Sequence, residues 1–331
     1  MTTSNSEIGM LSDAERYSWA SYYIFVIVSS LIGDSIILYA SNKRGAFHLN
    51  AFIVTIMQHI AVTDLSVAIV HIFPNAVSLI AGSWVLGDAW CYVKPYFAYW
   101  VYPCGKFLIC ALVMSKFLLL HFPLRTTGWS RNKAHKVCTA IWFSCLAYPL
   151  LFYLIDSENV LFDYKTYSCD YQLTAEIWKK ILPVAFTLTS IAPNAIIIIT
   201  SVPVLVIATK AARARQSNVN LRGVATVVLT VGVYLISTLP MSTYLVVASY
   251  VKGGYAIHYY LYRVGVSLGM INVMANFFIY SLTMTSFREF WLQKMRHIFR
   301  RPSVFPLTRE TQLELGEFAV QLEFVSEIFT C

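Results

Sequence analysis

The stretch WASYYIFVIVSSLIGDSIILYAS, residues 19–41, is apolar almost throughout and contains one charged residue, Asp34. A helix needs about 20 consecutive apolar residues to cross the hydrocarbon core of a bilayer. The stretch therefore predicts a transmembrane helix. Similar stretches follow at residues 50–73, 90–120, 136–155, 177–209, 221–250 and 258–283. We expect an all-α membrane protein, a seven-transmembrane helix bundle.

The composition agrees with a chain surrounded largely by lipid. Hydrophobic residues make up 57% of the 331 residues and charged residues only 13%, against about 25% charged in an ordinary soluble domain. The net charge of +8 does not indicate nucleic-acid binding, because the Lys and Arg residues form short runs between apolar stretches. Such runs set the orientation of a membrane protein.

Four segments are predicted from the positions of the apolar stretches. Residues 1–18 form an N-terminal segment, 19–283 the seven-span domain, 284–300 a short amphipathic eighth helix, and 301–331 an acidic tail. In the eighth helix, aromatic residues such as Phe290 alternate with cations such as Arg288, which is typical of a helix lying on the membrane surface. We found no internal repeat and no low-complexity tract.

The Lys and Arg residues predict the orientation. They are concentrated in the segments that lie inside when the N-terminus is outside. Because basic loops stay on the cytoplasmic side, we expect an N-terminus on the outer side and a cytoplasmic C-terminus. The inner loops carry no Asp or Glu, and attraction to anionic lipid explains this as well as partner binding does.

Two of the seven cysteines share the oxidising side in this orientation. Cys91 lies at the outer start of the third span and Cys169 in the following outer loop, 156–176. A disulfide between them would tie that loop over the helix bundle. The alternative, two free thiols, is less favoured in an oxidising compartment.

Several landmarks resemble those of the rhodopsin-like (class A) G-protein-coupled receptors. They occur in the family's order and spacing over about residues 19–300, and they are Trp84-Val-Leu-Gly87 before Cys91, Asp64, Trp142, Pro193, Pro240, Asn276-Phe-Phe-Ile-Tyr280 and Phe287. The chain is similar to a divergent, orphan or chemosensory-type member. The resemblance implies a disulfide-linked, multi-pass receptor for signal transduction, located in the plasma membrane with its N-terminus extracellular.

The chain departs from the family at its switch elements. Ser115-Lys116-Phe117 stands in place of Asp-Arg-Tyr, Thr238 lies where a Trp is usual, and Phe277 replaces a Pro. Lys116 keeps the charge of the family's Arg but not its forked donor geometry, so altered coupling is expected. The resemblance implies a G-protein contact made by Ser115, Lys116, Phe117, Lys210, Arg213, Arg215 and Arg222.

Charged residues deep inside spans are costly and indicate function. The predicted buried polar switch comprises Asp34, Asp64, Lys106, Asn272, Asn276 and Tyr280. In the family, the second-span Asp binds sodium. Our hypothesis is that the Lys106 ammonium reaches Asp64 or Asp34 and replaces the ion, so that no cofactor or metal is expected. The alternative is that Lys106 satisfies backbone carbonyls beside the Pro103 kink.

The resemblance also implies a ligand cavity. Its lining would be Tyr99, Tyr102, Met241, Leu245, Tyr262, Val266 and Met270, with Lys94 and Arg263 near the mouth. Ala98 replaces the Asp that pairs with amine ligands, and Met270 replaces the Lys that binds retinal. The expected ligand is small and non-aminergic: lipophilic, aromatic or weakly acidic.

The leading interpretation is a receptor that binds an extracellular ligand and activates a heterotrimeric G protein. One alternative is a receptor-like binding protein with lost or altered coupling. Another is a transporter that uses the buried Asp and Lys residues, although paired repeats are missing. No metal pair, nucleophile motif or phosphate loop indicates an enzyme.

Overall fold

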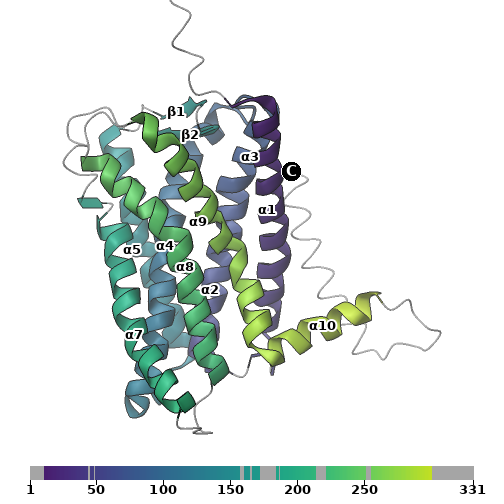
Figure 1. The fold of residues 1–331 in the computed structure, drawn as a ribbon, viewed down its shortest axis with the longest axis vertical. Coiled ribbons are helices and arrows are strands. Elements are labelled where there is room, and N and C mark those ends of the chain that lie inside the picture. The colour runs from purple at the N-terminus through teal and green to yellow at the C-terminus, as the bar shows by residue number, and fades with distance from the viewer. Residues whose placement is uncertain are drawn as a thin grey trace, which may run out of the picture.

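The computed structural model describes residues 11–43, 45–47, 49–156, 160–164, 166–171, 184–185, 187–213, 221–250 and 255–299. Long helices run side by side along the bundle (Figure 1). In chain order the described elements are α1 (Asp13–Ser41), α2 (Ala51–Val67), a π-helical turn (Ala68–Ile72), α3 (Phe73–Ala81), α4 (Asp88–His121), a 3₁₀ turn (Pro123–Thr126), α5 (Arg131–Asp156), β1 (Val160–Asp163), β2 (Ser168–Tyr171), a second π-helical turn (Thr187–Ile191), α7 (Ala192–Arg213), α8 (Leu221–Tyr250), α9 (Tyr255–Thr283) and α10 (Thr285–Phe299).

The all-α membrane fold is confirmed. In the described part of the chain, five helical segments are long and apolar enough to cross a bilayer: Asp13–Ser41, Ala51–Ala81, Asp88–Leu119, Thr187–Val206 and Tyr262–Thr283. The helices α5 and α8 complete the bundle beside them. Most of the segment 1–18 and all of the tail 301–331 lie outside the described residues, so those boundaries stay predictions.

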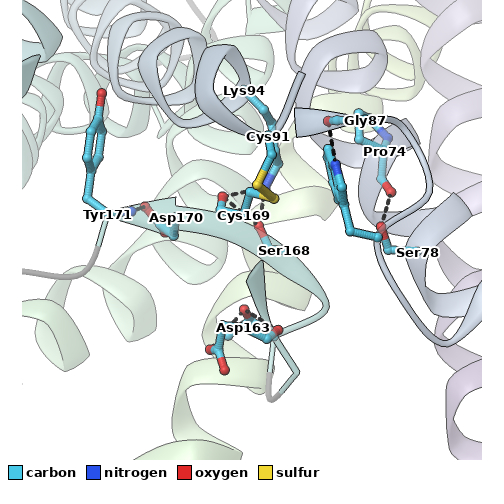
Figure 2. Close-up of a disulfide and its surroundings, with 12 residues drawn as sticks. Pro74, Ser78, Gly87, Cys91, Lys94, Asp163, Ser168, Cys169, Asp170 and Tyr171 are labelled. Carbon is cyan, nitrogen blue, oxygen red and sulfur yellow. Dashed lines mark hydrogen bonds between the residues drawn. A yellow bond between two sulfur atoms is a disulfide. The ribbon is translucent and has the colours of Figure 1, made fainter. Parts of the chain in front are cut away.

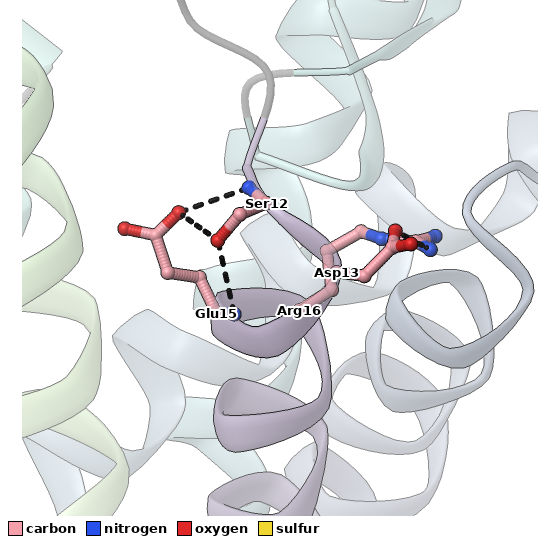
Figure 3. Close-up of polar contacts among 4 residues, drawn as sticks. All are labelled: Ser12, Asp13, Glu15 and Arg16. Atoms are coloured by element: carbon pink, nitrogen blue, oxygen red, sulfur yellow. Dashed lines mark hydrogen bonds and ion pairs between the residues drawn. The ribbon is translucent and has the colours of Figure 1, made fainter.

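The first helix begins earlier than the apolar pattern predicts, because a capping box precedes the apolar run (Figure 3). The Ser12 hydroxyl accepts the backbone N–H of Glu15 at 3.4 Å, and the Glu15 carboxylate accepts the backbone N–H of Ser12 at 2.9 Å. Arg16 pairs with Asp13 at 2.6 Å. These side chains satisfy backbone donors at the helix start, so α1 begins at Asp13 rather than at residue 19.

The second span contains a π-helical turn and continues as a helix beyond it. The π-helical turn Ala68–Ile72 joins α2 to α3, and Pro74 lies in the first turn after it. Proline has no N–H and clashes with the carbonyl four residues earlier. A wider turn accommodates both effects, and the span continues to Ala81 instead of ending at residue 73. Gly82, at φ 75°, ends α3 in the left-handed conformation that favours glycine.

The end of the seventh span is attached to the core through the helix that follows it, α10. At its end, α9 is followed by α10, which turns away from the bundle (Figure 1). Phe287 of α10 is fully buried and stacks on Phe47 with ring centroids 4.9 Å apart. The Trp291 indole N–H donates to Ser281 Oγ at 3.1 Å. These contacts attach α10 to the bundle; its position on a membrane surface stays a prediction.

Candidate ligand-binding site

A cavity of about 250 Å³ lies among α2, α4, α8, α9 and β2. Its wall includes five of the seven residues predicted to bind ligand: Tyr99, Tyr102, Met241, Tyr262 and Val266. The volume is slightly below the range of about 300–1,000 Å³ common for ligand pockets. The cavity therefore fits a small molecule with aromatic or aliphatic surface.

Met270 is a predicted lining residue that the structure places outside the cavity wall. It does not line the cavity and is 1% exposed, in a cluster with Val26 and Ile72. The cavity-facing positions of α9 are 262, 266, 269, 272 and 273, and a helix turns by about 100° per residue. One residue beyond Gly269, the Met270 side chain is therefore directed at the neighbouring helices. The Leu245 side chain lies outside the described set.

The roof of the cavity is the β1–β2 hairpin, tied to the start of α4 (Figure 2). The structure joins Cys91 and Cys169 in a disulfide, as predicted, with their Cα atoms 5.3 Å apart. The strands pair antiparallel, with Phe162 opposite Cys169. Lys94, one helical turn after Cys91, is 1% exposed. Its ammonium donates to Ser168 Oγ and to the Cys169 carbonyl oxygen. Lys94 therefore binds the hairpin, whereas the sequence placed it near the mouth of the cavity.

Asp170 also lines the cavity, although it was not among the predicted site residues. Its carboxylate accepts the Tyr171 backbone N–H at 2.8 Å. Burial raises the pKa of the Asp170 carboxyl, while the Lys94 ammonium, the Tyr171 N–H and the Tyr99 hydroxyl oppose that rise. The sequence signal was its position directly after Cys169, which fixes the strand against the bundle.

Lys106 lies lower in the cavity wall and has a different partner from the one predicted. Its ammonium donates to Ser190 Oγ at 2.8 Å. Among the described residues, no ion pair joins Lys106 to Asp64 or Asp34. Lys106 and Ser190 lie on α4 and on the turn before α7, so the long side chain points across the bundle, away from the second span. The predicted replacement of sodium by Lys106 is therefore not the arrangement seen here.

Two of the other buried polar residues, Asp34 and Asp64, each accept one side-chain hydrogen bond. Asn276 Nδ2 donates to Asp64 Oδ2 at 2.7 Å, and the Ser30 hydroxyl donates to Asp34 Oδ2 at 2.5 Å. Tyr280 is 1% exposed, and its hydroxyl has no hydrogen-bond partner among the described residues. Asp64 also lines the cavity, as does Asn272. The cavity thus extends from the hairpin to Asp64.

The predicted G-protein contact residues lie at the other end of α4 and beyond. Ser115 is buried and donates to the Ala111 carbonyl at 2.6 Å. Phe117 and His121 stack with ring centroids 4.2 Å apart. Lys116 is half-buried, and Lys210 at the end of α7 is exposed. The side chains of Arg213 and Arg222, and Arg215 as a whole, lie outside the described residues. Whether these residues bind a G protein stays a prediction.

Seven-helix topology, a roofed cavity and a buried acid in the second span define a transmembrane receptor. The sequence model of the family described as 7 transmembrane receptor (rhodopsin family) matches residues 33–280. The chain belongs to this family. It is also similar to cysteinyl leukotriene receptor 1 of Sus scrofa, with 24% identity over 141 residues. That match covers 42% of this chain and 41% of the relative.

Proposed function

We propose that the protein is a plasma-membrane receptor, N-terminus outside, that binds a small lipophilic ligand with a weakly acidic group and activates a heterotrimeric G protein. The observation that carries this proposal is Lys106. Its ammonium lies in the cavity wall with a neutral hydroxyl, Ser190, as its hydrogen-bond partner and no carboxylate paired with it in the described residues.

The rest of the wall supports the same ligand chemistry. Tyr99, Tyr102, Tyr262 and Met241 offer aromatic and apolar surface. A carboxylate that reaches Lys106 would complete a charge-assisted hydrogen bond in a site shielded from water, where such a bond is strong. Ala98 also lines the cavity and offers no counter-ion for an amine. The similar receptor is named for cysteinyl leukotrienes, which adds limited support because the match spans 41% of its length.

The test is nucleotide exchange on a panel of G proteins, with lipophilic carboxylic acids and their methyl esters as paired probes. We expect acids to activate the receptor and esters to be weaker by about tenfold or more, because a charged hydrogen bond contributes about 1.5–3 kcal/mol. Lys106→Gln should abolish the preference, and Lys106→Arg should retain it in part. Lys133→Gln, outside the cavity, is the matched control. Equal responses to acids and esters would refute the acidic-ligand proposal.

A second candidate is a receptor that binds ligand without coupling, and Ser115-Lys116-Phe117 favours it. Lys116→Ala and Lys116→Arg separate the two functions. Exchange lost in the Ala variant and kept in the Arg variant supports coupling through the charge. Ligand binding without exchange on any G protein, at normal surface expression, supports the uncoupled receptor. An N-terminal epitope detected on intact cells tests the orientation.

A further inference from the structure

Two histidines from different helices meet outside the ligand cavity. His59 Nε2 of α2 lies 3.1 Å from His135 Nδ1 of α5, with ring centroids 5.3 Å apart and an interplanar angle of 69°. Both side chains are half-buried, and neither lines the cavity. The pair lies toward the end of the bundle where α2 and α5 begin.

The helices that carry this pair are also joined by other contacts near the histidines. Phe52 of α2 packs on Trp129, just before α5, with ring centroids 4.4 Å apart. Asn42, which caps α1, accepts hydrogen bonds from Gln58 at 3.1 Å and from Arg131 at 2.9 Å. The three helices are thus cross-linked next to the histidines. The two ring nitrogens are held close together by packing that does not depend on them.

We infer that His59 and His135 form a binding site for a transition-metal ion, with Zn²⁺ the best fit. Zinc binds imidazole nitrogen at about 2.0–2.1 Å in tetrahedral geometry, which places two such nitrogens about 3.3 Å apart. The observed 3.1 Å is the length of a hydrogen bond between the rings and is close to that separation, so the ion would replace the proton that lies between the two nitrogens. Imidazole suits zinc, copper and nickel, whereas magnesium and calcium require oxygen ligands.

The number of ligands and the charge around the two histidines determine how strongly a metal ion should bind. The described residues contain no group of three or more His, Cys, Asp or Glu side chains that could hold a metal. Two protein ligands leave two positions for water, and Arg131, Lys133 and Lys136 on the same helix are cationic. The guanidinium of Arg131 is bonded to Asn42. Binding is therefore modest, in the micromolar range, and a bound ion would bridge α2 and α5.

The experiment measures the unfolding temperature of the purified full chain in detergent with and without micromolar ZnCl₂. An ion that binds only the folded state raises this temperature. We expect a rise in the wild type and in His297→Gln, an exposed control on α10, and none in His59→Gln, His135→Gln or the double variant. His135→Cys, which keeps a metal donor, should restore the zinc response, and Mg²⁺ should have no effect.

Each variant is compared with its own zinc-free unfolding temperature, so a variant of lower stability still reports binding. A zinc response that survives in the double variant would assign the ion to another site and overturn the inference. So would the absence of any zinc response in the wild type. Neither result depends on the ligand or on G-protein coupling, so this test is independent of the proposed function.

Discussion

The close packing of Gly33 in the first span against Phe277 in the seventh predicts a large effect of one methyl group at Gly33. A Cβ added there would lie 2.6 Å from Phe277 Cβ and 2.9 Å from Phe277 Cγ. Carbon atoms pack at about 3.5–4.0 Å, and Phe277 Cβ is attached to the backbone, so α1 and α9 must separate. Overpacking of this kind costs about 1–3 kcal/mol, and the higher helix propensity of Ala returns at most about 1 kcal/mol.

We therefore expect Gly33→Ala to destabilise the receptor by about 1–2 kcal/mol. At about 2–4 °C per kcal/mol, the unfolding temperature in detergent should fall by roughly 2–8 °C. Gly232→Ala in α8 is the matched control, because a Cβ there meets no atom within 4 Å. It should raise the unfolding temperature slightly through helix propensity. If Gly33→Ala were as stable as Gly232→Ala, the packing argument would be wrong.

Three further predictions concern the polar groups of the site. Because burial raises the pKa of Asp170, its contribution to stability is greatest below the unfolded-state pKa and is lost as pH rises through the raised value; Asp170→Asn should flatten that pH dependence of the unfolding temperature. Lys94→Met should speed amide exchange at Ser168, which Lys94 holds, while Lys94→Arg should be closer to wild type. Asn276→Ala should cost about 1–3 kcal/mol in unfolding measurements, because a buried oxygen of Asp64 loses its hydrogen-bond donor.

The sequence alone was sufficient for the spans and for much of the cavity wall. Apolar length predicts a transmembrane helix with little reference to its neighbours, because lipid is the same solvent on every outer face. The Cys91–Cys169 disulfide followed from the compartment. Tyr99, Tyr102, Tyr262 and Val266 line the cavity as expected, since they follow helical periodicity from recognised landmarks.

The remaining details depend on contacts that sequence patterns do not carry. Met270 follows Gly269 directly in α9, and the turn of the helix between these two residues directs the Met270 side chain into a packed cluster instead of the cavity. The direction of Lys106 depends on its flexible side chain and on Ser190, which is distant in sequence. Asp170 faces the cavity only because the hairpin is folded over it. The start of α1 was foreseeable from Ser12 and Glu15, whose spacing is that of a capping box.

The π-helical turn in the second span makes the cavity tolerant of a one-residue change in chain length at that point. A π-helical turn holds one residue more than an α-helical turn, and one residue corresponds to about 100° of rotation. His71 lies within this turn and faces the cavity. Removal of a single residue such as Ile69 would let a regular helix replace the wide turn, and the residues from Phe73 to Gly82 would keep nearly the same direction relative to α2, because the extra residue is absorbed within that turn. A one-codon deletion in the middle of α2 would instead rotate the following residues by about 100° and change which of them face the cavity.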